Sequence, residues 1–185
     1  MQVDKPRAVF QVAAVDNSVL KSIPLEDCEL LWKAYSEDPD SVGYFIDVGF
    51  RDEESAAISV KLWNSEMSRG EGLYLGIYVG SQLVGQIRSR KHSRLRSDSE
   101  QSCSLEYWLR PSFQRQGIMT HRIAVFLEFA SSFFPQAAYF EIVCHPDNQR
   151  SIALARRVGF QEVRRERHLR ETLPRLRLRR PVKAV

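Results

Sequence analysis

The stretch SLEYWLRPSFQRQGIMT, residues 104–120, decides the fold because it runs from a strand through a turn into a helix. Its aromatic first part stops at Pro111, which cannot donate to a sheet ladder. After Gly117, apolar residues recur at helical spacing: Ile118, Ile123, Phe126, Leu127 and Ala130. Such a turn is either a plain connection or a phosphate-binding loop. The second reading is open because the first N–H groups of a helix lack partners and the helix dipole is positive at that end.

A second motif, DNQRSIALARRVGF (147–160), follows the apolar strand AAYFEIVCHP and places Asn148 and Ser151 on the first turn of another helix, which ends at Gly159. Asn148 is suited to accept a hydrogen bond from the Ser151 N–H, so a simple helix cap is the alternative reading of this pair. The chain has no GK[ST] of a P-loop and no GxGxxG of a dinucleotide fold.

The rest of the chain supplies alternating elements. We predict a strand near residues 17–23, helices over 24–39 and 52–70, a hairpin over 72–90 turning at Gly80-Ser81, a loop over 91–102, a strand over 102–111 and a closing strand pair over 161–169 and 174–182. This order predicts a mixed sheet covered by helices, an α/β (α+β) architecture.

Composition indicates one ordinary globular domain. The 185 residues are 43% hydrophobic and 27% charged, so we expect a single domain over residues 1–185 with a core over about 10–181. The cysteines Cys28, Cys103 and Cys144 show no CxxC or metal spacing, which predicts packed thiols and a reducing compartment. We find no signal pattern and no apolar run long enough for a bilayer, so we expect a cytoplasmic protein without a membrane partner.

Positive charge is concentrated in the last 22 residues of the sequence. Residues 164–185 carry eight Arg and one Lys against two Glu, while the whole chain has a net charge of only +4. This end suits an anionic partner, or it is simply a solvated Arg-rich strand. It lacks interleaved aromatic residues and any RNA motif, so nucleic acid is not an expected partner.

Together, residues 104–120 and 144–160 resemble the GNAT superfamily of acetyl-CoA-dependent N-acetyltransferases, and within it the Rim-type branch that acetylates ribosomal-protein N-termini. The tyrosine-tryptophan pair, the glycine turn, Asn-x-x-Ser and Gly-Phe stand at family spacings. The resemblance implies a mixed, mostly antiparallel sheet of about six to seven strands with about four helices. It also implies that the fourth and fifth strands, holding Tyr107 and Glu141, splay apart around the pantetheine arm.

The resemblance further implies acetyl-CoA as cosubstrate and no metal. It assigns cofactor contacts to Leu109, Gln114, Arg115, Gln116, Gly117, Ile118, Met119, Thr120, Asn148 and Ser151. Two positions depart from the family pattern: Met119 replaces a small residue and Arg115 a common glycine. These changes leave fewer flexible positions but keep the backbone donors.

For catalysis, the resemblance assigns Ser151 as proton donor to the leaving thiolate and Asn148 as a contact near the thioester. Ala155 stands where many relatives carry the tyrosine acid. An N–H around Val143 or Cys144 is the expected partner of the oxyanion.

The general base stays open between three residues. Glu106 lies on the fourth expected strand, Glu171 follows the sixth, and His145 is a candidate acting through water. Each is equally readable as a surface charge. An α-amine makes a weak base tolerable, because with a pKa of about 8 roughly a tenth of it is neutral at pH 7.

Three functions compete. The first is acetylation of a protein N-terminus, such as that of a ribosomal protein. The others are acetylation of a small amine (a polyamine, an amino acid derivative or an aminoglycoside) and a noncatalytic acyl-CoA- or RNA-binding module. Phe45, Phe50 and Trp63 are candidates for an acceptor pocket or for the core. The sequence leaves a homodimer open.

Overall fold

The computed structural model describes residues 11–15, 17–37, 50–91, 101–166 and 175–182. Its helices are α1 (Cys28–Ser36), α3 (Glu53–Ser68), α4 (Ile118–Phe133) and α5 (Gln149–Arg157), with 3-10 turns η1 (Leu25–Asp27) and η2 (Pro111–Phe113). Its strands are β1 (Gln11–Val15), β2 (Ser18–Ser22), β3 (Gly72–Val79), β4 (Gln82–Arg90), β5 (Ser102–Ser104), β6 (Glu106–Leu109), β7 (Tyr139–Cys144), β8 (Gln161–Glu166) and β9 (Arg175–Pro181). Every helix expected from the sequence is present. The expected loop falls largely on residues 92–100, which lie outside the described residues.

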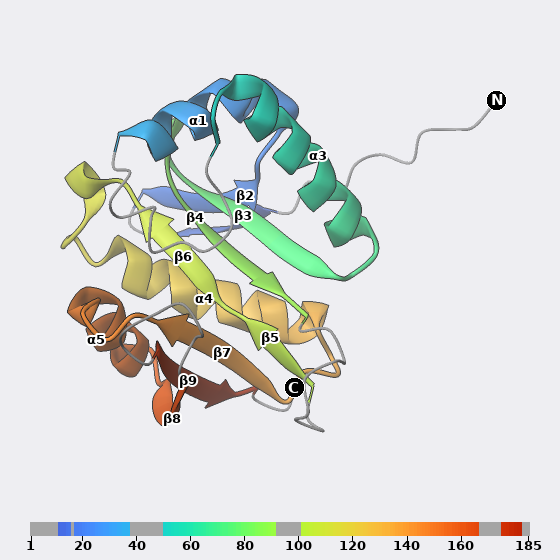
Figure 1. Ribbon diagram of the computed structural model, residues 1–185. Coiled ribbons are helices and arrows are strands. Elements are labelled where there is room, and N and C mark those ends of the chain that lie inside the picture. The colour runs from blue at the N-terminus through green and yellow to red at the C-terminus, as the bar shows by residue number, and fades with distance from the viewer. Residues whose placement is uncertain (1–10, 16, 38–49, 92–100, 167–174, 183–185) are drawn as a thin grey trace.

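The strands form two sheets (Figure 1). The first has the order β1-β2-β3-β4-β6 and is antiparallel throughout, and the second has the order β5-β7-β9-β8, with β5 parallel to β7. The fold class expected from the sequence is confirmed. The described residues contain more strands than the expected six to seven, because β1 was not foreseen and one expected strand divides.

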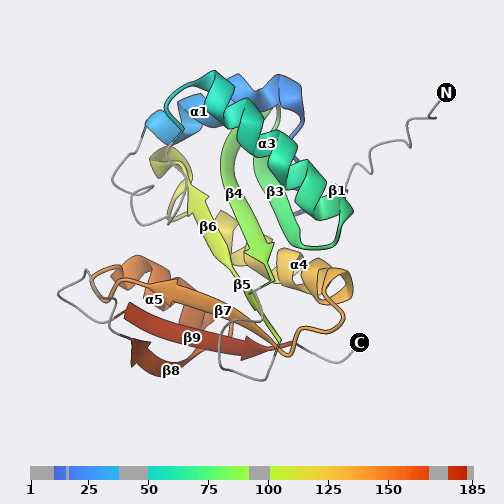
Figure 2. The ribbon, with the colours of Figure 1, turned by 45° about the vertical axis from the view of Figure 1, so that its right-hand side comes forward.

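The single strand expected over residues 102–111 is wrong, since it is two strands in different sheets. At the junction, the Leu105 N–H donates to the carbonyl oxygen of Glu141 at 2.7 Å. Strand β5 therefore belongs with β7, while β6 continues away and pairs with β4. From this junction β6 and β7 diverge, which is the splay implied by the family resemblance (Figure 2).

The hairpin of β3 and β4 turns where the sequence predicted. Val79 pairs with Gln82, so the loop is the two residues Gly80 and Ser81. Gly80 has φ of 60°, a left-handed conformation that glycine adopts without steric cost.

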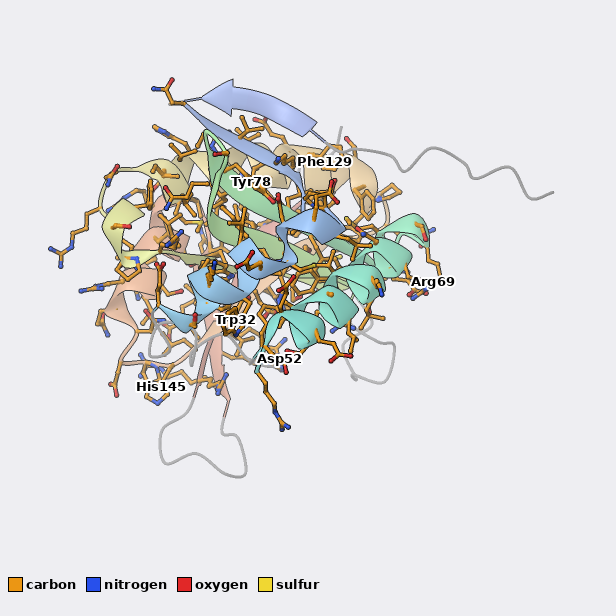
Figure 3. The ribbon with its side chains drawn as sticks, turned by 90° about the horizontal axis from the view of Figure 1, so that it is seen from above. Trp32, Asp52, Arg69, Tyr78, Phe129 and His145 are labelled. Atoms are coloured by element: carbon orange, nitrogen blue, oxygen red, sulfur yellow. The ribbon has the colours of Figure 1, made fainter. Side chains whose placement is uncertain are left out.

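Helices cover both faces of the first sheet. Figure 3 shows α1 and α3 on one face and α4, marked by Phe129, on the other. Helix α3 starts with a capping box in which Asp52 accepts the Ser55 N–H at 2.8 Å. Helix α4 buries Ile123, Phe126 and other apolar residues predicted from their spacing. None of the helices in the described segments is long and apolar enough to cross a membrane.

The Arg-rich end is only partly at the surface. Arg177 is buried and Arg179 half-buried on β9, where both contact the buried carboxylate of Glu141 on β7. The Arg179 Nε lies 2.7 Å from a Glu141 oxygen. Arg164 and Arg165 on β8 are exposed. Two of the arginines counted in the sequence therefore form ion pairs between β9 and β7. This corrects the interpretation of the Arg-rich end as a simply solvated strand.

Candidate active site

The turn that leads into α4 contains two residues with a left-handed backbone conformation. Arg115 has φ of 62° and Gly117 has φ of 80°, and both are exposed. Gly117 is the N-cap of α4, and no side-chain hydrogen bond caps the helix there. A Cβ atom built on Gly117 would meet no other atom within 4 Å. The turn thus needs glycine for its backbone conformation, and the space beside it is open.

Side chains of the first helical turn point inward while its N–H groups remain without helical partners. Ile118 and Met119 are buried, as is Leu109 at the end of β6, so these side chains serve the core. The helix offers no carbonyl to the N–H groups of Ile118, Met119 and Thr120. What this segment presents to an anion is therefore its backbone, together with the positive end of the helix dipole.

Asn148 caps the second helix. Its Oδ1 accepts the Ser151 N–H at 3.1 Å, as expected from the spacing. No hydrogen bond joins the Nδ2 group of Asn148 to any described residue. Capping and ligand binding are therefore compatible, because they use different atoms of one amide.

Gln114 connects the two motifs. Its Nε2 donates to the carbonyl oxygen of Leu109 at 2.9 Å, and its Oε1 accepts from Arg150 Nη1 on α5 at 3.3 Å. Gln116 steadies the same turn by donating to the Ser112 carbonyl oxygen at 2.8 Å. The start of α4 and the start of α5 are thereby held beside each other.

Tyr107 and Ser151 meet across the splay. The Tyr107 Oη on β6 lies 2.9 Å from Ser151 Oγ and 3.3 Å from the Ser151 carbonyl oxygen on α5. Burial raises the pKa of the Tyr107 phenol to about 12, although the hydrogen bond with Ser151 lowers it somewhat. The phenol is therefore protonated at neutral pH and acts as a donor.

Glu106 lies on the opposite face of β6 from Tyr107, because adjacent side chains on a strand alternate. Its Oε2 accepts from Arg88 Nε at 3.1 Å, and Arg88 Nη2 contacts the same oxygen. The Arg88 side chain is 6% exposed and that of Glu106 is 31% exposed. Among the described residues, no hydrogen bond involves Glu106 Oε1. The ion pair with Arg88 therefore orients the Glu106 carboxylate, and part of the side chain remains accessible to solvent.

Trp108 lies on the same face of β6 as Glu106, and other aromatic residues pack near it. Tyr35 of α1 makes edge contacts with Trp108 and Phe50, each with ring centroids 4.6 Å apart. Trp63 stacks on Tyr74 at 5.3 Å and is buried, so it belongs to the core. Phe50 is only half-buried and remains a candidate for the acceptor side. Phe45, named with them from the sequence, lies outside the described residues.

Of the two other candidate bases, only His145 lies among the described residues. His145 follows β7, and its Nδ1 accepts the Asp147 N–H at 3.3 Å. No hydrogen bond connects His145 with Glu106 or Ser151. Glu171 lies outside the described residues.

The backbone of β7 distinguishes Val143 from Cys144. The Glu141 carbonyl faces β5, since it accepts the Leu105 N–H at 2.7 Å. Main-chain groups alternate along a strand, so Val143 also faces that side, beyond the end of β5, while Cys144 faces β9. Val143 is thus the better candidate for an N–H open to the splay. Burial raises the pKa of the Cys144 thiol to about 11, which keeps it neutral and poorly nucleophilic at neutral pH.

No metal cluster is evident in the ranges that the structure describes: no group of three or more His, Cys, Asp or Glu side chains lies close enough to hold an ion. All three cysteines are buried and unpaired, as the sequence predicted.

Sequence reasoning missed three contacts of this site. They are Tyr107 with Ser151, Gln114 with Arg150 and Glu106 with Arg88, whose partners stand 44, 36 and 18 residues apart. Strand alternation does place Tyr107 and Glu106 on opposite faces of β6. No sequence pattern states which helix lies opposite each face.

A strand pair that splays, a glycine turn into one helix and an Asn-capped second helix define an acetyltransferase of the GNAT class. A family model described as "Acetyltransferase (GNAT) domain" matches residues 19–161. The chain belongs to this family, and it is an N-acetyltransferase that uses acetyl-CoA as its acetyl donor. The family expected from the sequence is confirmed.

Solved structures with the same fold cover nearly the whole chain. RimL, a ribosomal L7/L12 alpha-N-protein acetyltransferase in complex with coenzyme A, is 17% identical, with 94% of this chain and 98% of that chain covered and a TM-score of 0.78. Ribosomal-protein-S5-alanine acetyltransferase from Vibrio fischeri is 11% identical (95% and 97% covered, TM-score 0.79). The microcin C7 self-immunity acetyltransferase MccE, in complex with acetyl-CoA and AMP, is 17% identical (91% and 94% covered, TM-score 0.72). No curated protein matches the chain.

Proposed function

We propose that this enzyme acetylates the N-terminal α-amine of a protein, such as a ribosomal protein, in the cytoplasm. The observation that carries the proposal is the hydroxyl of Ser151, held by Tyr107 at the start of α5 and beside the splay of β6 and β7. RimL and the S5-alanine enzyme, which share the fold, are named for ribosomal-protein acceptors. Free, buried cysteines suit a reducing compartment.

Acetyl-CoA binding is assigned to backbone donors and one side-chain amide. The N–H groups at the start of α4 receive the pyrophosphate, with Gly117 allowing close approach and Arg115 adding charge. The Nδ2 group of Asn148 donates to the pantetheine arm, which lies between β6 and β7. The uncommitted donors of both helix starts support this assignment.

The chemistry is a direct transfer. The amine nitrogen attacks the thioester carbon, an oxyanion forms near the Val143 N–H, and the carbon–sulfur bond breaks with its electron pair on sulfur. Ser151 is on the Tyr107 side of β6 and Glu106 on the other side. The group proposed to protonate the leaving sulfur and the group proposed to accept the amine proton therefore lie on opposite faces of β6.

Glu106 is proposed as the base for the incoming amine. It is partly exposed, its Oε1 is uncommitted among the described residues, and aromatic side chains of α1 and β6 lie on the same face. An α-amine has a pKa of about 8, so a modest base suffices near neutral pH. A lysine, at about 10.4, would require a stronger one.

A small-amine acceptor is the second candidate. MccE, whose fold is similar, was solved with AMP beside acetyl-CoA. The described residues near Glu106 do not distinguish a peptide from a small molecule. A noncatalytic binding module is the third candidate, and the Tyr107–Ser151 contact speaks against it because a pure binding site does not require an oriented hydroxyl.

The proposal is tested by a calorimetric titration with acetyl-CoA at low and moderate salt, followed by thiol release. Peptides beginning with Ser or Ala, the same peptides with blocked N-termini, and small amines serve as acceptors. We expect binding at micromolar strength or better, and thiol release that requires the free N-terminus.

Each other outcome selects a different function. Release with small amines alone would replace the protein acceptor by the second candidate. Tight binding without release from any acceptor would favour the noncatalytic module. An absence of binding would contradict the whole assignment and show that Arg115 and Met119 have disabled the site.

A further inference from the structure

Tyr107 connects the first sheet to the helix that carries Ser151. It stands on β6 of the first sheet, and its hydroxyl reaches α5, which follows β7 of the second sheet. The ring is half-buried, so its hydroxyl gains from a partner inside the protein. Both partners that it finds, Oγ at 2.9 Å and the carbonyl oxygen at 3.3 Å, belong to Ser151.

These distances describe two arrangements of hydrogens. If Tyr107 donates to the Ser151 carbonyl, the Ser151 hydrogen points back to Tyr107. If Tyr107 donates to Ser151 Oγ, the Ser151 hydrogen is released to point into the splay. The second arrangement uses the shorter distance, 2.9 Å against 3.3 Å. Ala155, one turn further along α5, is fully buried and has no hydroxyl to take over this task.

We propose that Tyr107 is a positioning residue, which donates its hydroxyl hydrogen to Ser151 Oγ and thereby directs the Ser151 hydrogen at the leaving sulfur. The inference rests on the proposed function, in which Ser151 protonates coenzyme A. It adds Tyr107, from the first sheet, to a reaction in which Ser151 follows a strand of the second sheet. Residues from both sheets then control the transfer of the Ser151 hydroxyl proton.

The protons and electrons balance without ionising Tyr107. As the carbon–sulfur bond breaks, its electron pair goes to sulfur, which takes the Ser151 hydrogen. Glu106 takes the proton of the attacking nitrogen and releases it to solvent, from which Ser151 Oγ recovers a proton, so the products are an amide and a thiol. Throughout, Tyr107 keeps its proton, because burial raises the pKa of its phenol to about 12. Its hydrogen bond strengthens while Oγ carries negative charge.

A purely structural role for the same contact makes a different prediction. In that case, loss of the hydroxyl lowers stability and leaves the chemical step unchanged, as for any buried tyrosine that loses its partner. Tyr78 provides the matched control, since it is buried on β3 and donates to Asp27 Oδ2 at 2.8 Å. Neither Tyr78 nor Asp27 belongs to the candidate site.

The test compares Tyr107→Phe, Ser151→Ala, the double variant and Tyr78→Phe, each titrated with acetyl-CoA and assayed with the peptide that the wild type acetylates fastest. For Tyr107→Phe we expect kcat to fall about 10- to 100-fold while the dissociation constant of acetyl-CoA changes less than about twofold. The double variant should match Ser151→Ala, because Tyr107 acts only through Ser151. Tyr78→Phe should keep the wild-type kcat.

Two results would overturn the role of Tyr107 alone: an unchanged kcat in Tyr107→Phe, or losses that multiply in the double variant. A wild type that binds acetyl-CoA but releases no thiol with any acceptor would overturn the proposed function, and the inference with it.

Discussion

Asn148 carries two tasks that a pair of substitutions can separate. Asn148→Asp keeps an oxygen for the Ser151 N–H but removes the Nδ2 donor, whereas Asn148→Ala removes both. We expect Asn148→Ala to lower the free energy of unfolding by about 1 kcal/mol and Asn148→Asp to leave it nearly unchanged. Both should weaken acetyl-CoA binding about 5- to 10-fold, as the loss of one hydrogen bond does.

Urea unfolding and calorimetry check this prediction. If Asn148→Asp bound acetyl-CoA like the wild type, the residue would be a cap and nothing more.

Glu106 joins a structural contact to a proposed catalytic one. Glu106→Gln removes the negative charge of the carboxylate that pairs with the buried Arg88 guanidinium, so the free energy of unfolding should fall by about 1–3 kcal/mol. If Glu106 is the base, kcat at pH 7 should fall about 100-fold, and the deficit should shrink as the pH rises past about 8 and the amine becomes neutral.

A matched control is Glu66→Gln, because Glu66 on α3 is a buried carboxylate that pairs with Arg90 at 3.0 Å. It should lose comparable stability without any pH-dependent loss of kcat. A deficit in Glu106→Gln that is equal at pH 7 and pH 9 would assign the residue to structure alone.

At the scale of elements, two glycine turns offer a comparison within one chain. Gly117 and Gly80 both have positive φ, and a Cβ on either would meet no atom within 4 Å. Alanine at either site should lower the free energy of unfolding by about 1 kcal/mol, because its Cβ disfavours the left-handed conformation. Only Gly117→Ala should weaken acetyl-CoA binding, since Gly80 lies in the β3–β4 hairpin. Equal affinities in the two variants would remove the turn before α4 from the binding site.

Most helices and strands can be predicted from local sequence patterns, and the elements that cannot be predicted lack such a pattern. Helix α4 follows from apolar spacing, and the two-residue turn at Gly80 and Ser81 follows from alternation on both sides. The division of residues 102–111 does not, because Leu105 changes sheets through a hydrogen bond to Glu141, 36 positions away. Strand β1 was missed as well, and QVAAV carries no clear alternation of apolar and polar residues.

The candidate site divides in the same way. Asn148 as a cap and Gly117 as the glycine of the turn before α4 are local features, and the sequence indicated both. The links from Tyr107 to Ser151 and from Gln114 to Arg150 depend on how α5 packs near β6 and α4. Such packing is a property of the whole fold, so the residues could be named while their partners could not.

At the scale of the whole molecule, buried weak acids should make stability fall in alkali. Burial raises the pKa of Tyr107 and of Cys103 to about 12 and that of Cys144 to about 11, from ordinary values of 10 and 9. A raised pKa in the folded state means that the folded protein keeps protons that the unfolded chain has lost. The stabilisation is therefore complete below about pH 9 and is lost as the pH rises towards 12.

Urea unfolding at a series of pH values measures this effect. Tyr107→Phe should flatten the decline between pH 10 and pH 12, the window set by the unfolded and folded values for Tyr107. A decline of unchanged slope would show that the phenol is less protected than its burial indicates.

The divergence of β6 from β7 has a consequence for handling the free enzyme. Among the described strands, β6 pairs only with β4, so no described strand hydrogen-bonds to its second edge. An open edge is a template for any extended chain, and nascent or partly unfolded copies supply such chains. Acetyl-CoA lying along that edge would act as a shield. Purification in the presence of acetyl-CoA should therefore reduce aggregation of the enzyme, and this effect does not depend on turnover.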